Sequence, residues 1–483
     1  MQFTEANISK LFGNEAAEQE PVDRLKEYYF KNNIYDQVIC DAPLRILVGH
    51  KGIGKSALVK IGMDEDEHNG YLSILIRPDD VVGIASDNKN LLELIRDWKL
   101  GLNSIISCKI LDSLGYEGNS NIDVAKSVSG KFISFVAETI TAYKDKINLT
   151  PAKEMLIDKF LKNRRLVIYI DDLDRGWEGK PLDIKRISAL LNAVRDMSSD
   201  NSGLFFRIAL RSDVYFLVRT SDESTDKIES SVIWYSWSNH EILVLLAKRI
   251  ETFFGHLTNE QQLLSLSQGE ISKKLNGVFE PKFTGQGLWE NAPIYRVLMS
   301  LIRKRPRDLV KLCIASARQA YLDKSETINT KHLKAVFEDY SQGRIQDTIN
   351  EYRTELVDIE RLLMGMKPNK KTKIAKQSYF FSTDQLLQKI DSIIQSGKFK
   401  FANNKDADKK DLAQFLYKIN FITARKELTS DLIQRKYFEE NRYISSKFAD
   451  FGYDWEIHPA YRWALQPDNI DDLFSTLHLS SDD

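Results

Sequence analysis

The chain has 483 residues, 42% of them hydrophobic and 28% charged, so it is an ordinary globular protein of roughly two to four domains. Its 68 Lys and Arg residues nearly balance 69 Asp and Glu residues, which argues against a protein that coats nucleic acid by bulk charge but allows a local basic patch. Three cysteines without a CxxC pair argue against a disulfide framework or a zinc site, and no secretory signal or membrane-length apolar run is seen, so we expect a cytoplasmic protein without a membrane partner.

Five short apolar runs predict strands in the first half of the chain. They show little alternation of polar and apolar residues, which is typical of buried parallel strands. Helical patterns separate them, so the sequence predicts an α/β fold with a three-layer core and a mostly parallel sheet. The runs are Leu44–Val48, Tyr71–Ile76, Leu166–Ile170, Leu204–Leu210 and Ser231–Tyr235.

The gap between the second and third runs is long and predicts a helical insertion at about residues 80–163. Helical segments are expected near Asn90–Leu114, Gly130–Lys144 and Pro151–Asn163, with a loop at Gly115–Asp123. Residues 1–240 would therefore form the core, with an N-terminal extension and this insertion.

After Tyr235 the pattern changes to helices without strands, which predicts an all-helical lid domain at residues 241–365. Glu241–His256 is amphipathic, and a second helix begins at Pro306, where a proline suits the first turn. A lysine-rich linker and helical segment follow at 366–405, where KPNKKTKIAK is more typical of a solvated linker than of a DNA-binding arm.

Residues 406–483 predict a winged-helix-like domain with an acidic tail. A short helix at Leu412–Ile419 precedes strand-like pieces at Arg442–Phe448 and Tyr453–Ile457. The tail begins after Gln466, and we expect part of it to fray.

Residues 49–56 read GHKGIGKS directly after the first predicted strand and match the phosphate-loop pattern G-x-x-x-x-G-K-[ST]. The glycines let backbone N–H groups cradle phosphate, Lys55 reaches the β- and γ-phosphates, and the Ser56 hydroxyl is a ligand for Mg²⁺. The positive end of the following helix adds to this attraction. The sequence therefore predicts a P-loop NTPase core that binds ATP and Mg²⁺ through Gly49, His50, Lys51, Gly52, Ile53, Gly54, Lys55, Ser56 and Ala57.

The third apolar run ends in Asp171 and Asp172. In P-loop enzymes, a buried strand adjacent to the phosphate loop presents an Asp that holds Mg²⁺, and we assign that role to Asp171. Asp172 is the candidate general base for the attacking water. Solvated carboxylates are the alternative for both. Because Asp172 stands where Glu is common, we expect slow hydrolysis. Asp174 and Arg175 are given no role.

Two arginines are candidates to read the γ-phosphate. Arg211 ends the fourth predicted strand, at the sheet edge where ligands bind, and could stabilise transition-state charge; the alternative is a surface pair with Asp213. Arg307 lies in the basic stretch IRKRPRDL, residues 302–309, and could swing onto the nucleotide. That stretch could instead bind nucleic-acid phosphates or be a solvated basic turn. The aromatic stretch Tyr28–Phe30 fits adenine recognition and core packing equally well.

GHKGIGKSAL, IDDLDR, ALRSD and RPRDL, in this order, resemble the AAA+-related P-loop ATPases at the border of the KAP and STAND classes. That bacterial branch is often encoded in mobile or anti-phage loci. The resemblance implies that residues 49–56 are Walker A and that Asp171 and Asp172 are Walker B. It implies that Arg211 is the first sensor arginine and Arg307 the second. KAP proteins often carry membrane segments between the Walker motifs, whereas this chain has a non-membrane insertion there.

Three functions remain open. The first is an ATP-binding, slowly hydrolysing switch that controls a partner or self-assembly, with an effector or regulatory protein encoded nearby and a homo-oligomer as expected partners. The second is a DNA-binding ATPase similar to origin-recognition or transposition regulators, whose winged helix reads duplex DNA. The third is a nucleotide-stabilised scaffold without turnover. A complete nucleotide motif without a second catalytic motif favours the first.

Overall fold

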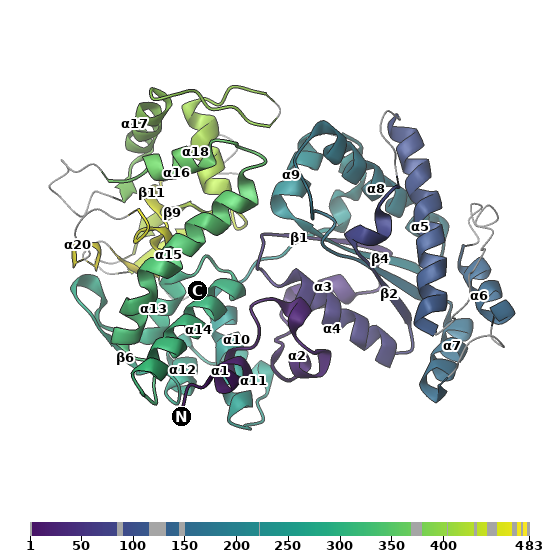
Figure 1. The fold of residues 1–483 in the computed structure, drawn as a ribbon, viewed down its shortest axis with the longest axis horizontal. Helices are drawn as coiled ribbons and strands as arrows, with labels where there is room; N and C mark the ends of the chain where they lie inside the picture. Colours follow the sequence, from purple (N-terminus) through teal and green to yellow (C-terminus); the bar gives the residue numbers. More distant parts are fainter. Residues whose placement is uncertain are drawn as a thin grey trace. The chain divides into compact units, whose positions relative to one another are not determined.

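The computed structural model describes residues 2–84, 90–114, 132–143, 150–221, 223–368, 379–402, 404–428, 432–441, 452–465, 471–474 and 477–480 (Figure 1). The chain divides into two compact units. We call Lys31–Lys51 with Lys55–Tyr235 the sheet unit, and Met1–Phe30 with Gly52–Gly54 and Ser236–Asp483 the terminal unit. The first thirty residues thus group with the terminal unit, whereas the sequence analysis assigned them to the core as an extension.

The sheet unit contains a five-stranded parallel sheet in the order β2-β3-β4-β1-β5, which confirms the predicted α/β core (Figure 1). Strands β1 to β4 are short, largely buried runs rich in Ile, Leu and Val, as expected for strands covered on both faces, whereas the edge strand β5 buries only Ile233. The bounds agree with the predicted runs to within one residue at each end. The strands are β1 Leu44–Gly49, β2 Leu72–Ile76, β3 Leu166–Ile170, β4 Leu204–Arg211 and β5 Val232–Trp234.

The two faces of this sheet have separate cores, because successive side chains of a strand point to opposite sides. On β3, Ile168 joins a large core built with the helices of the insertion and with α8 and α9. Tyr169, the next residue, joins a smaller core with Val59 of α4 on the other face. Helices therefore cover both faces, and the three-layer arrangement is confirmed.

The helical insertion is present at the predicted place, between β2 and β3. The helix bounds observed there match the predicted segments closely. The helices of the sheet unit are α3 Asn33–Ile39, α4 Lys55–His68, η2 Pro78–Val81, α5 Leu91–Leu114, α6 Phe132–Tyr143, α7 Pro151–Asn163, α8 Pro181–Asp200, α9 Ser212–Ser221 and η5 Glu223–Ser231.

The terminal unit begins with α1 Glu5–Phe12, η1 Ala17–Gln19 and α2 Val22–Tyr28. Tyr28, Tyr29 and Phe30 are buried, and the Phe30 ring lies 6.1 Å from that of Trp237. The aromatic stretch therefore packs in a core, which is one of its two predicted roles. The helices that follow are α10 Asn239–Phe253, α11 Glu260–Ser265, α12 Gln268–Ser272, η6 Lys273–Leu275, α13 Ile294–Leu301, α14 Pro306–Leu322, α15 Thr330–Tyr352 and α16 Ile359–Gly365.

This lid region is mostly helical, as predicted, and local signals set its helix starts. Ser238 caps α10 and Glu241 completes the capping box, while Pro306 occupies the first turn of α14. The lid also contains an antiparallel pair that the sequence analysis did not predict, β6 Lys282–Thr284 with β7 Glu290–Pro293, joined through η7 Gly287–Trp289. These strands are too short to give a clear periodicity.

The C-terminal part has a second five-stranded sheet in the order β12-β10-β9-β11-β8. An antiparallel hairpin of β9 and β10 follows α18, so a helix followed by a hairpin is present where a winged helix was predicted. Of its five strands only β11 was predicted, as Tyr453–Ile457, whereas β8, β9, β10 and β12 were not. Its elements are β8 Phe380–Phe381, α17 Thr383–Ile394, α18 Lys409–Lys418, β9 Ile422–Glu427, β10 Leu432–Lys436, β11 Asp454–Ile457, η9 Pro459–Tyr461, α20 Asp471–Phe474 and β12 Leu479–Ser480.

Several predictions lie outside the described residues: the loop at Gly115–Asp123, the strand at Arg442–Phe448, most of the lysine-rich linker and parts of the acidic tail. Within the described part of the chain, no helix is both long and apolar enough to span a bilayer.

Candidate nucleotide-binding site

The candidate site lies at the carboxyl edge of the parallel sheet. Gly49, the last residue of β1, is the register partner of Arg211 at the end of β4. Asp171 follows β3 directly, and its N–H donates to Ile76 O at the end of β2, 3.2 Å away. The structure thus brings the start of the phosphate loop, Asp171 and Arg211 to one edge, as predicted. Ligands of open α/β sheets bind at such edges.

One detail of this edge differs from the sequence analysis. The carboxylate strand was expected to be adjacent to the phosphate-loop strand, but β4 pairs with both β1 and β3 and separates them. The expectation was wrong because sequence patterns identify buried strands without giving their order. The consequence is that Arg211, on the intervening strand, is the direct neighbour of Gly49.

The phosphate loop has the backbone that its glycines predict. Gly52 and Gly54 have φ values of 81° and 106°, in a region that residues with side chains rarely adopt. The Lys55 ammonium donates to Gly49 O at 2.8 Å and to His50 O at 3.1 Å. Lys55 also begins α4, so its positive charge and the helix N-terminus coincide. The loop thus offers a concentrated positive site suited to phosphate.

His50 connects the phosphate loop to the end of β4. Its Nδ1 lies 3.0 Å from Ser212 Oγ, and both side chains are buried. His50 is a predicted nucleotide-binding residue as a member of the loop, whereas Ser212 was not predicted. No sequence signal links residues so far apart in the chain, since the contact depends on the pairing of β1 with β4.

Asp171 and Asp172 differ in their surroundings. Asp171 is half-buried, and its Oδ1 accepts the Asp172 N–H at 2.9 Å. Asp172 is exposed and has a φ of 61°, a left-handed conformation that Asp tolerates better than most residues. Its carboxylate lies 3.7 Å from the Arg175 guanidinium. A strained, solvent-facing carboxylate next to a half-buried one suits two different roles at one strand end.

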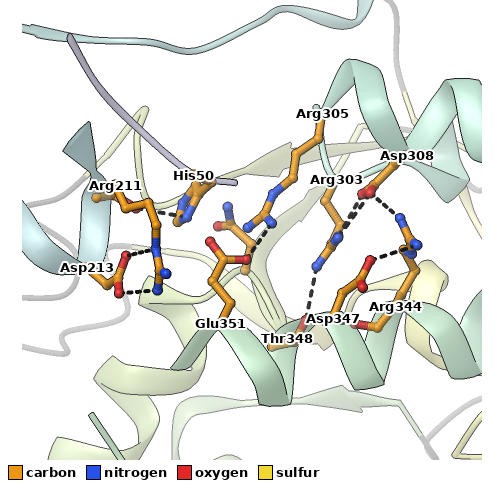
Figure 2. Close-up of polar contacts among 12 residues, drawn as sticks. His50, Arg211, Asp213, Arg303, Arg305, Asp308, Arg344, Asp347, Thr348 and Glu351 are labelled. Atoms are coloured by element: carbon orange, nitrogen blue, oxygen red, sulfur yellow. Dashed lines mark hydrogen bonds and ion pairs between the residues drawn. The ribbon is translucent and has the colours of Figure 1, made fainter. Parts of the chain in front are cut away.

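Arg211 is held by two carboxylates. Its guanidinium makes two hydrogen bonds to Asp213, at 3.0 and 2.6 Å (Figure 2). It also lies 3.2 Å from Asp174. The pair with Asp213 is the alternative that the sequence analysis weighed, although Asp213 is buried, so this is not a surface pair. Asp174, which was given no role, completes the group. Both carboxylates therefore compete with a γ-phosphate for the charge of Arg211.

Arg307, the other candidate γ-phosphate reader, is half-buried in the terminal unit together with Gly52. Its N–H donates to Gly52 O at 3.3 Å, and its Nε donates to Glu15 O at 3.0 Å. A Cβ added at Gly52 would come within 3.0 Å of Arg307 Cβ, so glycine is needed there for close approach as well as for its φ. Arg307 therefore lies beside the tip of the phosphate loop.

The other cations of the basic stretch are buried and paired. Arg303 bonds Asp308 at 2.7 and 3.0 Å, and Arg344 bonds the same carboxylate at 2.5 Å (Figure 2). Burial alone would raise the pKa of Asp308, but the guanidinium groups of Arg303 and Arg344 hold that pKa far below its usual range. Arg305 pairs with Glu351 at 3.1 Å.

Two of the alternatives for this stretch are therefore wrong for Arg303 and Arg305, which are 3% and 2% exposed. They are neither a solvated basic turn nor a surface for nucleic-acid phosphates. Lys304, which is also buried, pairs with Glu440 at 2.6 Å. The sequence showed the cations but not their acidic partners, which lie on α14, on α15 and beyond β10.

The residues present fit a Mg²⁺ ion that arrives with a nucleotide. Among the described residues, no group of three or more His, Cys, Asp or Glu side chains is placed to hold a metal by itself. Mg²⁺ in phosphate sites is usually held by one or two protein oxygens, the phosphates and water. Ser56 at the start of α4 and Asp171 at the end of β3 supply oxygens of that kind.

Neither a protein-family profile nor a curated protein matches the chain. Similar solved structures include the Walker-type ATPase of Pyrococcus abyssi, with 12% identity over 92% of this chain and 96% of that chain and a TM-score of 0.41. The ORC2 protein of Aeropyrum pernix, solved as ADPNP and ADP complexes, has 12% identity over 93% and 90% and a TM-score of 0.40. The ORC1 protein of the same organism, in complex with DNA, has 11% identity over 97% and 93% and a TM-score of 0.33. At these TM-scores the likenesses assign no function.

Proposed function

We propose that this protein is an ATP-binding, slowly hydrolysing molecular switch that controls a partner protein or its own assembly. The observation that carries the proposal is the meeting of the phosphate loop, Asp171 and Arg211 at one edge of the sheet. A phosphate loop serves nucleotides, and a carboxylate at this edge is the usual companion of nucleotide-bound Mg²⁺.

In this proposal each residue has a distinct task. Residues 49–54 supply backbone N–H groups, and the Lys55 ammonium leaves the loop carbonyls to meet the β- and γ-phosphates. Ser56 and Asp171 hold Mg²⁺, which neutralises phosphate charge when bound. Asp172 orients the attacking water and accepts its proton. Arg211 and Arg307 contact the γ-phosphate and report its presence.

Two features support slow turnover. Asp172 is shorter than the Glu common at this position, so its carboxylate reaches less far from the backbone. Arg211 is engaged by Asp213 and Asp174, whose negative charges offset part of the positive charge that it could offer in the transition state. Slow hydrolysis suits a switch whose bound nucleotide defines a state better than it suits a motor.

Phosphate release tests the proposal directly. We expect slow release by the wild-type protein and loss of release in Lys55→Ala and in Asp172→Ala. Nucleotide binding, measured by calorimetry, should be lost in Lys55→Ala and kept in Asp172→Ala. Binding without any release by the wild type would support the scaffold function instead. Normal release by Asp172→Ala would show that Asp172 is not the general base.

The DNA-binding alternative has lost part of its basis, because Arg303 and Arg305 are buried in ion pairs. A mobility shift with short duplex DNA at two salt concentrations separates the two functions, since binding through phosphates weakens steeply with salt. Two finer parts of the proposal rest on the sequence motifs alone. They are a relationship to ATPases at the border of the KAP and STAND classes and a role in bacterial anti-phage defence.

A further inference from the structure

A pocket of about 550 Å³ lies between α5 and α8 in the sheet unit. One face of α5 lines it with residues at helical spacing, among them Ile95, Lys99 and Asn103. The C-terminal half of α8 contributes Arg195 and Asp196 among others. Pockets of this size in proteins hold small organic molecules. We call it the α5–α8 pocket.

Two polar atoms of the pocket's lining residues have no partner among the described residues. Asn103 is 5% exposed, and its Oδ1 accepts no hydrogen bond; Arg195 Nη1 is also buried and donates none. Buried polar groups are almost always paired, so each unpaired atom needs an explanation. Asn201, in the same lining, is paired at both amide atoms: it accepts from Phe132 N–H and donates to Met197 O. Arg195 Nη1 is a donor that suits an anionic oxygen, and Asn103 Oδ1 is an acceptor that suits an ordered water.

The charge of the lining favours an anion. Arg96, Lys99, Arg195 and Lys227 give four positive charges, and Asp196 and Asp200 give two negative charges, so the lining has an excess of two positive charges. Asp196 already pairs with Lys99 at 2.7 Å and with Arg195 at 2.8 Å. Arg96 and Lys227 are exposed cations beside the pocket, where they can attract a negative group.

The apolar part of the lining is aliphatic. Leu91, Ile95 and Leu100 of α5 and Met197 of α8 supply it, and among the described residues no aromatic ring lines the pocket. A nucleobase is usually held by stacking or by a dedicated set of hydrogen bonds, whereas an aliphatic wall suits a flexible hydrocarbon group. The lining therefore suits a ligand that combines an apolar body with an anionic head.

We propose that the α5–α8 pocket binds a small amphipathic anion, a carboxylate or phosphate monoester on an aliphatic body. The pocket also connects the insertion with the proposed ATPase site at the carboxyl edge of the sheet. Helix α8, which lines the pocket, follows the segment of Asp171 and Asp172 and packs against β4 and β1. A ligand that fixes α8 against α5 thus alters ATP hydrolysis. This second part rests on the proposed function, whereas the binding does not.

Calorimetry tests the binding. Decanoate, octyl phosphate and inorganic phosphate are titrated into full-length Lys55→Ala protein, in which the phosphate loop no longer competes for phosphate. We expect saturable one-to-one binding of both amphipaths and none of inorganic phosphate at the same concentrations. The double variant Arg96→Glu/Lys227→Glu should bind about tenfold more weakly, because attraction becomes repulsion at two positions.

Lys162→Glu is the matched control, since Lys162 is an exposed lysine of α7 outside the pocket. It should bind like its parent. Absence of saturable binding by both amphipaths, equal affinity in the double variant, or equally tight binding of inorganic phosphate would each overturn the proposal.

Phosphate release by the otherwise wild-type protein, with and without decanoate, tests the coupling. We expect a change of about twofold or more that disappears in Arg96→Glu/Lys227→Glu. An unchanged rate with decanoate bound overturns the coupling. If the protein releases no phosphate at all, the proposed ATPase function fails, while calorimetry still decides the binding.

Discussion

The four cations at positions 303–307 show that residue type alone does not reveal the role of a charged side chain. Arg303 and Arg305 are buried and paired with carboxylates of α14 and α15, while Arg307, two residues further on, lies beside Gly52. Their pattern in the sequence is a single basic stretch. The degree of burial separates the structural arginines, Arg303 and Arg305, from Arg307, the candidate to contact the nucleotide. A buried charge must have a partner, whereas a half-buried charge can change partners.

Asp308→Ala tests the structural group. The change leaves Arg303 and Arg344 buried without their shared carboxylate, so we expect a loss of about 3–5 kcal/mol in the free energy of unfolding, measured by urea denaturation. Asp339→Ala is the control, since Asp339 is exposed on α15, and it should change the free energy by less than about 0.5 kcal/mol. A loss in Asp308→Ala as small as the control's would mean that the ion pairs add little stability.

At the scale of elements, the strands of the parallel sheet were predictable, whereas most strands of the other sheets were not. β1 to β4 are runs of apolar residues whose character is visible in the sequence. β6, β7 and β8 have two to four residues and owe their form to a partner strand, and β9 and β10, which mix charged and apolar residues, were not predicted either. β11 is an intermediate case. It was predicted as a strand, but its Glu456, which is buried and pairs with both Arg435 and Arg462, was not singled out.

Glu456 makes the stability of the C-terminal sheet depend on pH. Burial alone would raise its pKa, but Arg435 and Arg462 lower it to about 2, below the 4.5 of a free Glu. A pKa lowered by folding gives stability that is present above pH 4.5 and lost as the pH falls toward 2. The difference corresponds to about 3 kcal/mol.

We therefore expect the unfolding free energy of the wild-type protein to fall between about pH 5 and pH 2, as measured by denaturation at a series of pH values. Glu456→Gln should be less stable at pH 7 and should show a smaller fall over this range. Parallel pH profiles for the two proteins would show that Glu456 is not responsible.

At the scale of the whole molecule, the chain forms two units, each with its own sheet. The sheet unit contains the phosphate-loop strand, both candidate carboxylates and Arg211. The terminal unit contains Arg307 and the C-terminal sheet. A formal net charge of −1 leaves little overall repulsion between molecules, so association driven by a nucleotide is not opposed by bulk charge.

The switch function predicts that nucleotide changes the size of the particle in solution. Light scattering of the purified protein should give a larger mass with ATP and Mg²⁺ than with ADP or without nucleotide. Lys55→Ala should keep one mass under all three conditions. A constant mass in the wild type would exclude self-assembly and leave control of a separate partner, to be sought by the same measurement with that partner present.

The sequence by itself determined the strands of the parallel sheet, the insertion and the phosphate loop, because each is a pattern of neighbouring residues: an apolar run, a helical period, glycines at fixed spacing. Only the tertiary structure decided the strand order, the pairing of Gly49 with Arg211, the group around Asp308 and the α5–α8 pocket. These depend on which distant segments meet. Where such segments meet, burial decides whether a charged side chain pairs within the core or can bind a ligand. Burial cannot be read from the residue type.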